Sequence, residues 1–422
     1  MSNPSQPAEW LGLLKWSLSY TDGTRNDNIS PMSPEDRAFL EEVMKHGIVN
    51  ESERMKEILS ELTLYFDSQD DTVSSPSTPD KQEEIENLLL ELRDLVGLID
   101  YAKMFTVMGG ASLLMAIASF ESSSSWIPSI RIRTTCMIVL ATLCQNNPSV
   151  QKTMIDQGHL VRLMHLFISL FQHIQIRNSN EMNIDEKQDR TWIASMDELL
   201  LFSTRIMQAI SASVRDFVLA EEVFCKHELS SRCIENGLGI WMNSPLQDES
   251  ILSSSRWLML RKKTLFFLQA LITSDTSNAS RLSLFQTSID YIARHCLHSH
   301  IGTDVELREM SLSFFIRIYE RQYDSNMDEN THLFLQEFMA QRCGIDSSTN
   351  LHEHQDQEDD EQEELLLCQQ LHHLLLTRTS RSVVEASQVD SIDTNDAVTA
   401  THGPMLMLLP ASADRSHETI PQ

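Results

Sequence analysis

Three pairs of histidines are the first candidates for chemistry in this sequence, because imidazole binds metal ions and carries protons near neutral pH. They are His298 and His300, His352 and His354, and His372 and His373. A protein metal site needs three or four ligands that converge on one point. The first pair lies beside a predicted turn and the second lies in an acidic run. Adjacent residues such as the third pair point about 100° apart on a helix. We therefore expect no metal site.

The seven cysteines form no CxxC pair, which is typical of a protein from a reducing compartment. Cys136 and Cys144 recur at a spacing that places them on one face of a predicted helix, as do Cys225 and Cys233, and we interpret both pairs as buried thiols. The chain contains no glycine-rich phosphate loop, nucleophile elbow or metalloprotease helix. We expect neither an enzyme nor a cofactor, and a location in the cytoplasm, with the nucleus as a second compartment.

Basic residues near the beginnings of successive predicted helices remain as candidates for binding. They are Arg131, Arg133, Arg205, Arg261, Lys262, Lys263 and Arg308. In an armadillo-like solenoid the leading helix of each unit lines the concave side, so these residues would form a ladder that faces an acidic protein surface. The alternative is that they solubilise the helix ends. The residue pattern leaves both interpretations open.

A repeated pattern of leucine-rich helices must position these residues. The stretch LLLELRDLVGLIDYAKMFTVMGGASLLMAIASF is followed by IRIRTTCMIVLATLCQNNPSVQKTMIDQGHLVRLMHLF, and in each copy a long helix and a short helix precede a glycine and another helix. The two glycines, Gly110 and Gly158, are about 48 residues apart, within the range of solenoid repeats. Weaker copies follow. We predict an all-α, armadillo-like, right-handed helical solenoid with N-terminal capping helices and disordered termini.

Composition narrows the range of partners. The chain has 422 residues, is 41% hydrophobic, and has only 12 glycines and 12 prolines, which suits long helices. Its formal charge of −28 argues against nucleic acid and against an anionic membrane surface. Much of the charge imbalance comes from 346–364, which holds nine acidic residues and no Lys or Arg. We interpret this segment as a flexible insertion, with a binding element as the alternative. The longest uncharged stretch is too short and too glycine-rich for a membrane span.

The predicted organisation is as follows: a flexible arm at 1–28, capping helices at 30–66, a linker at 67–82, an armadillo-like repeat domain at 83–345, an acidic insertion at 346–364, a closing helix at 365–376 and a disordered tail at 377–422. The arm carries an apolar cluster around Trp10, formed by Leu11, Leu13, Leu14, Trp16 and Leu18. Such a cluster is either a docked capping helix or a motif that partners bind.

Five stretches give the chain a family resemblance. They are LLKWSLSY, MSPEDRAFLEEVM with RMKEIL, LLELRDLVGLIDYAKMFTVMGGASLL, IRIRTTCMIVLATLCQNNPSVQKTMIDQGHL, and LLLCQQLHHLL. With these stretches the chain resembles the Fes/Hsp-binding-protein family of armadillo-type nucleotide-exchange factors for 70-kDa heat-shock chaperones. The likeness extends over about 9–375 in outline and is specific over about 30–170.

The resemblance implies a monomeric binding module that grips the chaperone's ATPase domain with its concave face and promotes ADP release. By motif, Arg131, Arg133, Thr134 and Thr135 on one helix, and Arg261 and Lys262 on a later one, would contact the chaperone. The apolar arm residues from Leu11 to Leu18 would act as a pseudo-substrate that helps to eject clients. The alternative is a scaffold or transport adaptor that binds an extended peptide, but its regular ladder of Trp and Asn is missing from the leading helices.

Overall fold

The computed structural model is built of helices throughout the residues that it describes. These are 34–35, 37–38, 51–67, 79–119, 128–178, 194–240, 254–277, 279–297, 304–321, 327–345 and 363–378. None of them forms a strand, which confirms the predicted all-α class. The arm residues, the tail from 379 onward and the acidic segment at 346–362 lie outside the described residues.

The described helices fall into successive units that follow one plan, a long leading helix, a short helix and a third helix. The first unit comprises α4 (Pro79–Leu95), α5 (Ile99–Val107) and α6 (Gly110–Ser119). The second comprises α7 (Ile130–Cys144), α8 (Pro148–Asp156) and α9 (His159–Asn178). The third comprises α10 (Met196–Val214), α11 (Val218–Lys226) and α12 (Ser230–Leu238). The fourth comprises α14 (Ser255–Thr273), α15 (Ala279–Leu284), α16 (Gln286–Tyr291) and the π-helix η3 (Ile292–Cys296). The fifth comprises α17 (Val305–Glu320) and α18 (Glu329–Ile345).

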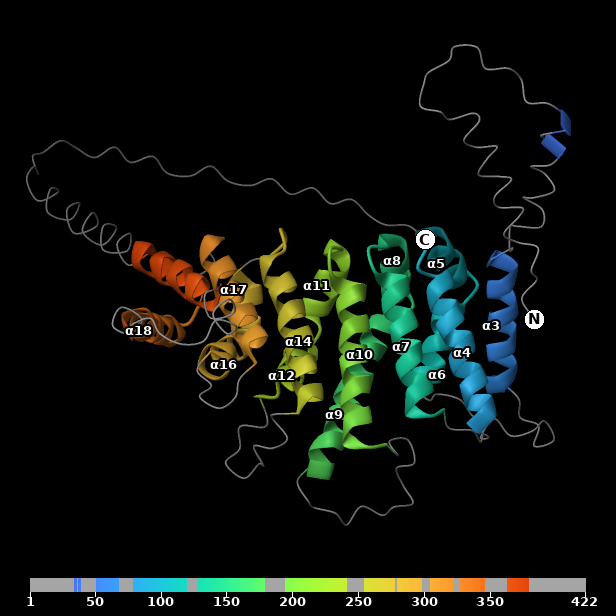
Figure 1. The fold of residues 1–422 in the computed structure, drawn as a ribbon, viewed down its shortest axis with the longest axis horizontal. Coiled ribbons are helices and arrows are strands. Elements are labelled where there is room, and N and C mark those ends of the chain that lie inside the picture. Colours follow the sequence, from blue (N-terminus) through green and yellow to red (C-terminus); the bar gives the residue numbers. More distant parts are fainter. Residues whose placement is uncertain are drawn as a thin grey trace, which may run out of the picture.

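The units stack so that equivalent helices lie side by side (Figure 1). The leading helices α4, α7, α10, α14 and α17 pack in that order into one layer. The short helices α5, α8 and α11 follow one another along one edge, and α6, α9, α12 and α16 form the other layer. At the ends of the stack lie α3 (Glu51–Asp67), which packs on α4, and the helix at 363–378. A single amphipathic helix pair cannot bury its apolar face, so stacking supplies the core.

The sequence sets where the leading helices begin. Each of four helices is preceded by a residue whose side chain accepts a hydrogen bond from a backbone N–H of the first turn: Ser129, Ser195, Ser254 and Asp304. At Ser195 the cap is reciprocal, because Glu198 accepts hydrogen bonds from the Ser195 backbone N–H and hydroxyl, both at 2.8 Å. Such capping boxes satisfy backbone donors that have no partner inside the helix.

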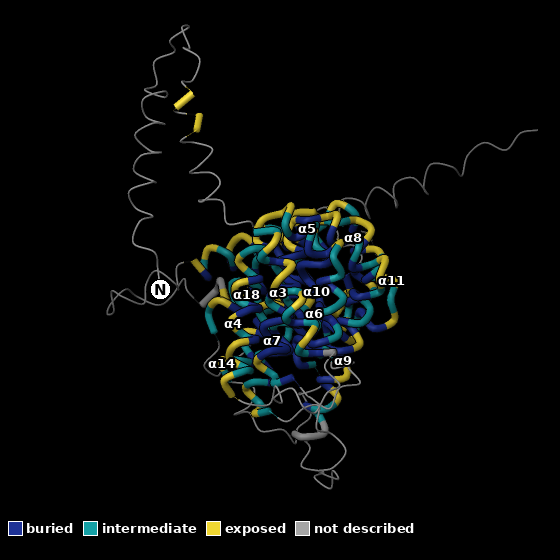
Figure 2. Tube along the Cα trace, turned by 90° about the vertical axis from the view of Figure 1, so that its right-hand side faces the viewer, coloured by how far each residue is buried: buried dark blue, intermediate teal, exposed yellow. Residues whose placement is uncertain are grey.

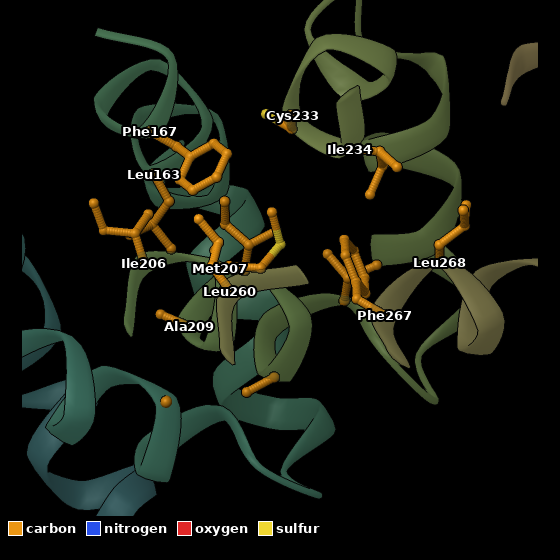
Figure 3. Packing of buried hydrophobic residues seen from close by; sticks show 14 of the residues in the cluster. Leu163, Phe167, Ile206, Met207, Ala209, Cys233, Ile234, Leu260, Phe267 and Leu268 are labelled. Carbon is orange, nitrogen blue, oxygen red and sulfur yellow. The ribbon is translucent and has the colours of Figure 1, made fainter. Parts of the chain in front are cut away.

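The core is continuous along the stack, and buried residues fill its centre while exposed residues lie at the rim (Figure 2). Between the second and fourth units, Phe167 of α9, Met207 of α10 and Phe267 of α14 face a common interior (Figure 3). Cys136, Cys144 and Cys233 are buried, as predicted, whereas Cys225 is only partly buried. Among the described residues no single helix is long and apolar enough to cross a membrane, although α5 and α6 pass that test as a pair bent by 75°.

Polar contacts tie each short helix to the next unit. Gln151 of α8 donates to the carbonyls of Ala212, at 2.8 Å, and Arg215, at 2.9 Å, at the end of α10. Glu221 has the equivalent place in α11 and is paired at 2.9 Å with Arg281, whose side chain is also buried. Arg281 in turn donates to the Leu271 carbonyl, at 3.0 Å, near the end of α14. The last carbonyls of α10 are thus satisfied by a side chain of the unit before it, and that of Leu271 by Arg281 of its own unit, which pairs with Glu221 of the unit before.

The glycine that corresponds to Gly158 in the first unit is Gly109, whereas we predicted Gly110. Gly109 has φ 87° and Gly158 has φ 71°, so these two glycines hold the left-handed position between the short and third helices. Gly110 is instead the first residue of α6, where an added Cβ would lie 2.2 Å from the ring of Phe105. Position 110 therefore requires glycine because the Phe105 ring approaches closely, and not because the backbone there has a positive φ.

Two predicted boundaries also differ. Helix α4 begins at Pro79, inside the range 67–82 that we predicted as a linker, because proline is well tolerated in the first turn. The closing helix occupies 363–378, and its first turn takes Glu363 and Glu364 from the end of the predicted acidic insertion.

Candidate functional site: the leading-helix face

The concave side of the solenoid, lined by the leading helices, is the predicted binding face, and the side chain of Arg133 is buried beneath it. Arg133 of α7 is 1% exposed, and its Nε donates to the carbonyl of Ala118, at the end of α6, at 2.7 Å. Its guanidinium lies 5.0 Å from the ring centre of Phe202 on α10. Burial lowers the pKa of Arg133 to about 10. Arg133 therefore joins the first three units internally, and we correct its assignment as a partner contact.

Thr134 and Thr135 are also covered. They are 7% and 5% exposed, because α7 lies between α4 and α10 in the stack. Their hydroxyls donate to carbonyls one turn earlier, Thr134 to Ile130 at 2.6 Å and Thr135 to Arg131 at 3.0 Å. Neither side chain offers a contact surface, and this part of the predicted site is corrected as well.

Arg261 repeats the role of Arg133 two units later. Its Nε donates to the carbonyl of Leu238, at the end of α12, at 2.9 Å, and its Nη2 donates to the hydroxyl of Tyr291 at 3.0 Å. Arg261 is half-buried, with its guanidinium 5.8 Å from the ring centre of Trp257. An arginine of a leading helix thus satisfies the last carbonyl of a preceding third helix. Arg261 keeps part of its surface, and its contact with a partner stays a prediction.

Three further members of the predicted ladder form ion pairs with the neighbouring leading helix or the closing helix. Arg131 of α7 pairs with Glu86 of α4 at 2.9 Å. Lys262 of α14 pairs with Asp304 at 2.6 Å and also with Glu306. Arg308 of α17 pairs at 2.8 Å with Glu364, whose side chain is 9% exposed. These basic residues link units, although Arg131 keeps 72% of its side chain exposed.

Four further cations of the leading helices lie on two matched stripes, which we call the α10 stripe and the α14 stripe. The α10 stripe is Arg205, Gln208, Ala212 and Arg215, and the α14 stripe is Arg256, Met259, Lys263 and Phe266. Both have the same spacing, which keeps a set of residues on one side of a helix. The guanidinium of Arg215 lies 4.7 Å from the ring centre of Phe266. Each residue of the α10 stripe is separated by the same number of positions from its counterpart in the α14 stripe. The contact between Arg215 and Phe266 therefore sets the alignment of the other three pairs.

The electrostatics of the face change along the stack. Helix α4 is rich in Asp and Glu, whereas α7 and α14 contain neither, and α10 has only Asp197 and Glu198 in its first turn. Among the described residues, Arg205, Arg215, Arg256 and Lys263 have no ion pair with a carboxylate. Met259 and Phe266 are 39% and 45% exposed. The centre of a strongly acidic chain thus presents cations around two apolar side chains, a combination suited to an acidic protein surface.

Sequence reasoning found Arg205 and Lys263 but missed Arg215, Arg256, Met259 and Phe266. The signal was present, because in each helix the four residues recur at helical spacing. It was obscured because Met259 and Phe266 resemble core residues, and only the stack shows which face of α14 is covered.

One Ser–His contact occurs outside this face and does not form a nucleophile–base pair. The Ser112 hydroxyl on α6 donates to Gln157 Oε1 at 3.1 Å and lies 3.1 Å from His159 Nε2. Arg162 Nη1 lies 3.4 Å from His159 Nδ1. Since arginine only donates, Nδ1 accepts and Nε2 carries the proton. His159 therefore donates to Ser112, and the contact links α6 to α9. Groups of three or more metal-ligating side chains are also missing from the described residues.

Comparisons with known proteins leave the family open. No model of a known protein family matches the chain, and no curated protein matches it. Among solved structures, a crystal structure of an engineered protein matches 78% of this chain and 98% of its own, with 10% identity and a TM-score of 0.42. A likeness of that size carries no functional argument, so function is argued from the residues of the face.

Proposed function

We propose that this chain is a co-chaperone of the Fes/Hsp-binding-protein type, a nucleotide-exchange factor for a cytosolic 70-kDa heat-shock chaperone. It would bind the chaperone's ATPase domain through the leading-helix face, promote ADP release and assist client release. The observation that carries the proposal is the uncompensated positive charge of the α10 and α14 stripes on a chain of net charge −28. The sequence resemblance of the first two units supplies the partner's identity.

The mechanism follows from linkage. A partner that binds the open form of the ATPase domain better than the closed form shifts the domain toward opening by its difference in affinity. The open form holds nucleotide weakly, so ADP leaves and ATP enters. The stack suits this role, because buried hydrogen bonds such as those from Arg133 to Ala118 and from Gln151 to Ala212 link neighbouring units.

The contact residues of the proposal differ from those that the resemblance implies. In this proposal Arg205, Arg215, Arg256 and Lys263 take the place of the buried Arg133, Thr134 and Thr135, while Arg131, Arg261 and Lys262 stay as predicted contacts. Electrostatic attraction of this kind acts mainly on the encounter rate and on the register of the complex.

Calorimetric titration with a purified ATPase domain tests the assignment of the face. The double variant Arg256→Glu and Lys263→Glu should weaken binding at least tenfold, because each reversal opposes an acidic partner. Lys152→Glu together with Lys226→Glu, two exposed lysines on the short-helix edge, is the matched control with the same change in charge. Equal weakening by both pairs would show an effect of net charge alone, and unchanged binding of the first pair would remove the face from the proposal.

The arm residues Leu11, Leu13, Leu14, Trp16 and Leu18 lie outside the described residues, and their role remains part of the proposal. A chain lacking residues 1–28 should keep its effect on ADP release and lose its effect on client release. Loss of both effects would make the arm a structural cap. Binding to the chaperone without any effect on ADP release would favour the alternative, a tethering adaptor.

A further inference from the structure

Arg205 and Arg256 hold equivalent positions in the two matched stripes, and neither forms an ion pair with a carboxylate among the described residues. Arg205 of α10 and Arg256 of α14 have the same sequence separation as Arg215 and Phe266, whose contact at 4.7 Å sets the alignment of the two helices. Both arginines are half-buried. Burial and, second, the positive charge of Arg256 lower the pKa of Arg205. Two guanidinium groups placed side by side repel each other, more strongly where water is partly excluded.

The hydrogen bonding of Arg205 is incomplete. Its Nη1 donates to Gln208 Oε1 at 2.8 Å, which fixes the side chain along the α10 stripe. Its Nε is buried and has no hydrogen-bond partner among the described residues. Buried donors are nearly always satisfied in proteins, so a buried N–H of a charged group without a partner calls for an explanation. The buried Nε is itself out of reach of a partner, so an acceptor on another molecule would meet the terminal nitrogens of the guanidinium.

We propose that Arg205 and Arg256 together form a subsite for one carboxylate of a protein partner, an aspartate or glutamate side chain. A carboxylate has two oxygens and accepts hydrogen bonds from two guanidinium groups at once, and its negative charge removes their mutual repulsion. This inference rests on the proposed function, which places the binding site on the leading-helix face. It adds the chemical identity of the group that binds there.

The neighbours of the subsite favour a protein carboxylate over a small anion. Met259 follows Arg256 by one turn and is 39% exposed, and Phe266 lies further along the same stripe with 45% exposure. The cation Lys263 lies between them, about 10 Å along the helix axis from Arg256. The bound element should therefore present a carboxylate at Arg205 and Arg256, an apolar side chain at Met259, and a second acidic group near Lys263.

A double-mutant cycle with the ATPase domain tests whether one carboxylate uses both arginines. Arg205→Gln and Arg256→Gln keep most of the side-chain length, and each should weaken binding about tenfold, the effect of losing one charged hydrogen bond. The double variant should bind about as weakly as either single variant, because the carboxylate is shared. Additive losses would contradict a shared carboxylate, and no loss in either variant would overturn the subsite.

Arg93→Gln, on α4, is the control that removes one exposed arginine elsewhere. Melting temperatures separate binding from folding: relief of repulsion predicts that Arg256→Gln melts no lower than the original chain. A lower melting temperature with unchanged affinity would assign Arg256 a structural role and overturn the proposal.

A second probe keeps the subsite testable if the chaperone is the wrong partner. A short poly-glutamate peptide should raise the melting temperature of the original chain and leave that of the double variant unchanged. The same rise with inorganic phosphate would identify a small-anion site instead and overturn the protein carboxylate. If the peptide does not raise the melting temperature and the ATPase domain does not bind, the subsite and the proposed function are both overturned. If the peptide raises the melting temperature but the ATPase domain does not bind, the subsite stands and the chaperone is rejected as the partner.

Discussion

The guanidinium of Arg215 lies 4.7 Å from the centre of the Phe266 ring, across the boundary between the third and fourth units. This contact joins the end of α10 to the middle of α14 while Phe266 stays 45% exposed. It also fixes which residues of the two helices are neighbours, and so brings the cations of both helices onto one surface. A cation above an aromatic face is attracted by the ring's charge distribution, which contributes about 1 kcal/mol at a partly exposed site.

Arg133→Ala should lower the free energy of unfolding by about 2–4 kcal/mol, because it leaves a cavity and an unsatisfied Ala118 carbonyl. Arg205→Ala, in the adjacent unit, should cost less than about 1 kcal/mol, since that side chain is only half-buried. Urea denaturation of both variants measures the difference. Equal free energies of unfolding for the two variants would contradict a structural role for the buried Arg133 side chain.

Removing one member of the buried pair Glu221 and Arg281 should cost about 3–5 kcal/mol, because the other charge stays buried without its partner. The pair is separated by 2.9 Å, and both side chains are 6% exposed. Replacing both residues, with Glu221→Leu and Arg281→Met, should recover most of that loss. Thermal denaturation of the three variants provides the comparison, and a double variant that is less stable than both single variants would contradict this account.

The adjacent glycines Gly109 and Gly110 should respond differently to alanine. At Gly110 the new methyl group would overlap the ring of Phe105, so we expect a loss of at least about 2 kcal/mol. At Gly109 the cost should be about 1 kcal/mol, from the backbone alone, since nothing lies within 4 Å of the added atom at φ 87°. Denaturant midpoints of the two variants test the order, and the reverse order would contradict the close approach of the Phe105 ring to Gly110.

The buried thiols predict a loss of stability at alkaline pH. Burial raises the pKa of Cys144 to about 12 and that of Cys296 to about 11, above the unfolded value of about 8.5. A raised folded pKa contributes stability that is fully present below the unfolded pKa and is lost as pH rises through the folded one. Stability should therefore decline from about pH 8.5 upward. Alkylation followed by mass spectrometry should find both thiols unmodified in the folded chain at pH 8, and rapid modification of either would contradict their burial.

The helical units were predictable from sequence because their signals are local. Leucine spacing, the serine caps and the turn around Asn147 and Pro148 act within a few residues, and stacking then follows from the need to cover each apolar face. The burial of Cys136 and Cys144 follows from the same periodicity.

The partners of the basic residues were not predictable, because they come from the neighbouring unit. Glu86, Asp304 and Glu364 lie far along the chain from Arg131, Lys262 and Arg308, and loop lengths set which of them face each other. Arg133 was misassigned for a related reason. A basic residue early in a leading helix looks exposed, but the preceding third helix ends beside it and offers a carbonyl.

The central claim is that the α10 and α14 stripes bind an ATPase domain and speed its release of ADP. Stopped-flow release of a fluorescent ADP analogue from a purified 70-kDa heat-shock chaperone tests it most directly. The account predicts acceleration that saturates with the concentration of this protein and requires at least tenfold more of the variant carrying Arg256→Glu and Lys263→Glu. Release that is unchanged by the original chain, or accelerated equally by the variant, would contradict it.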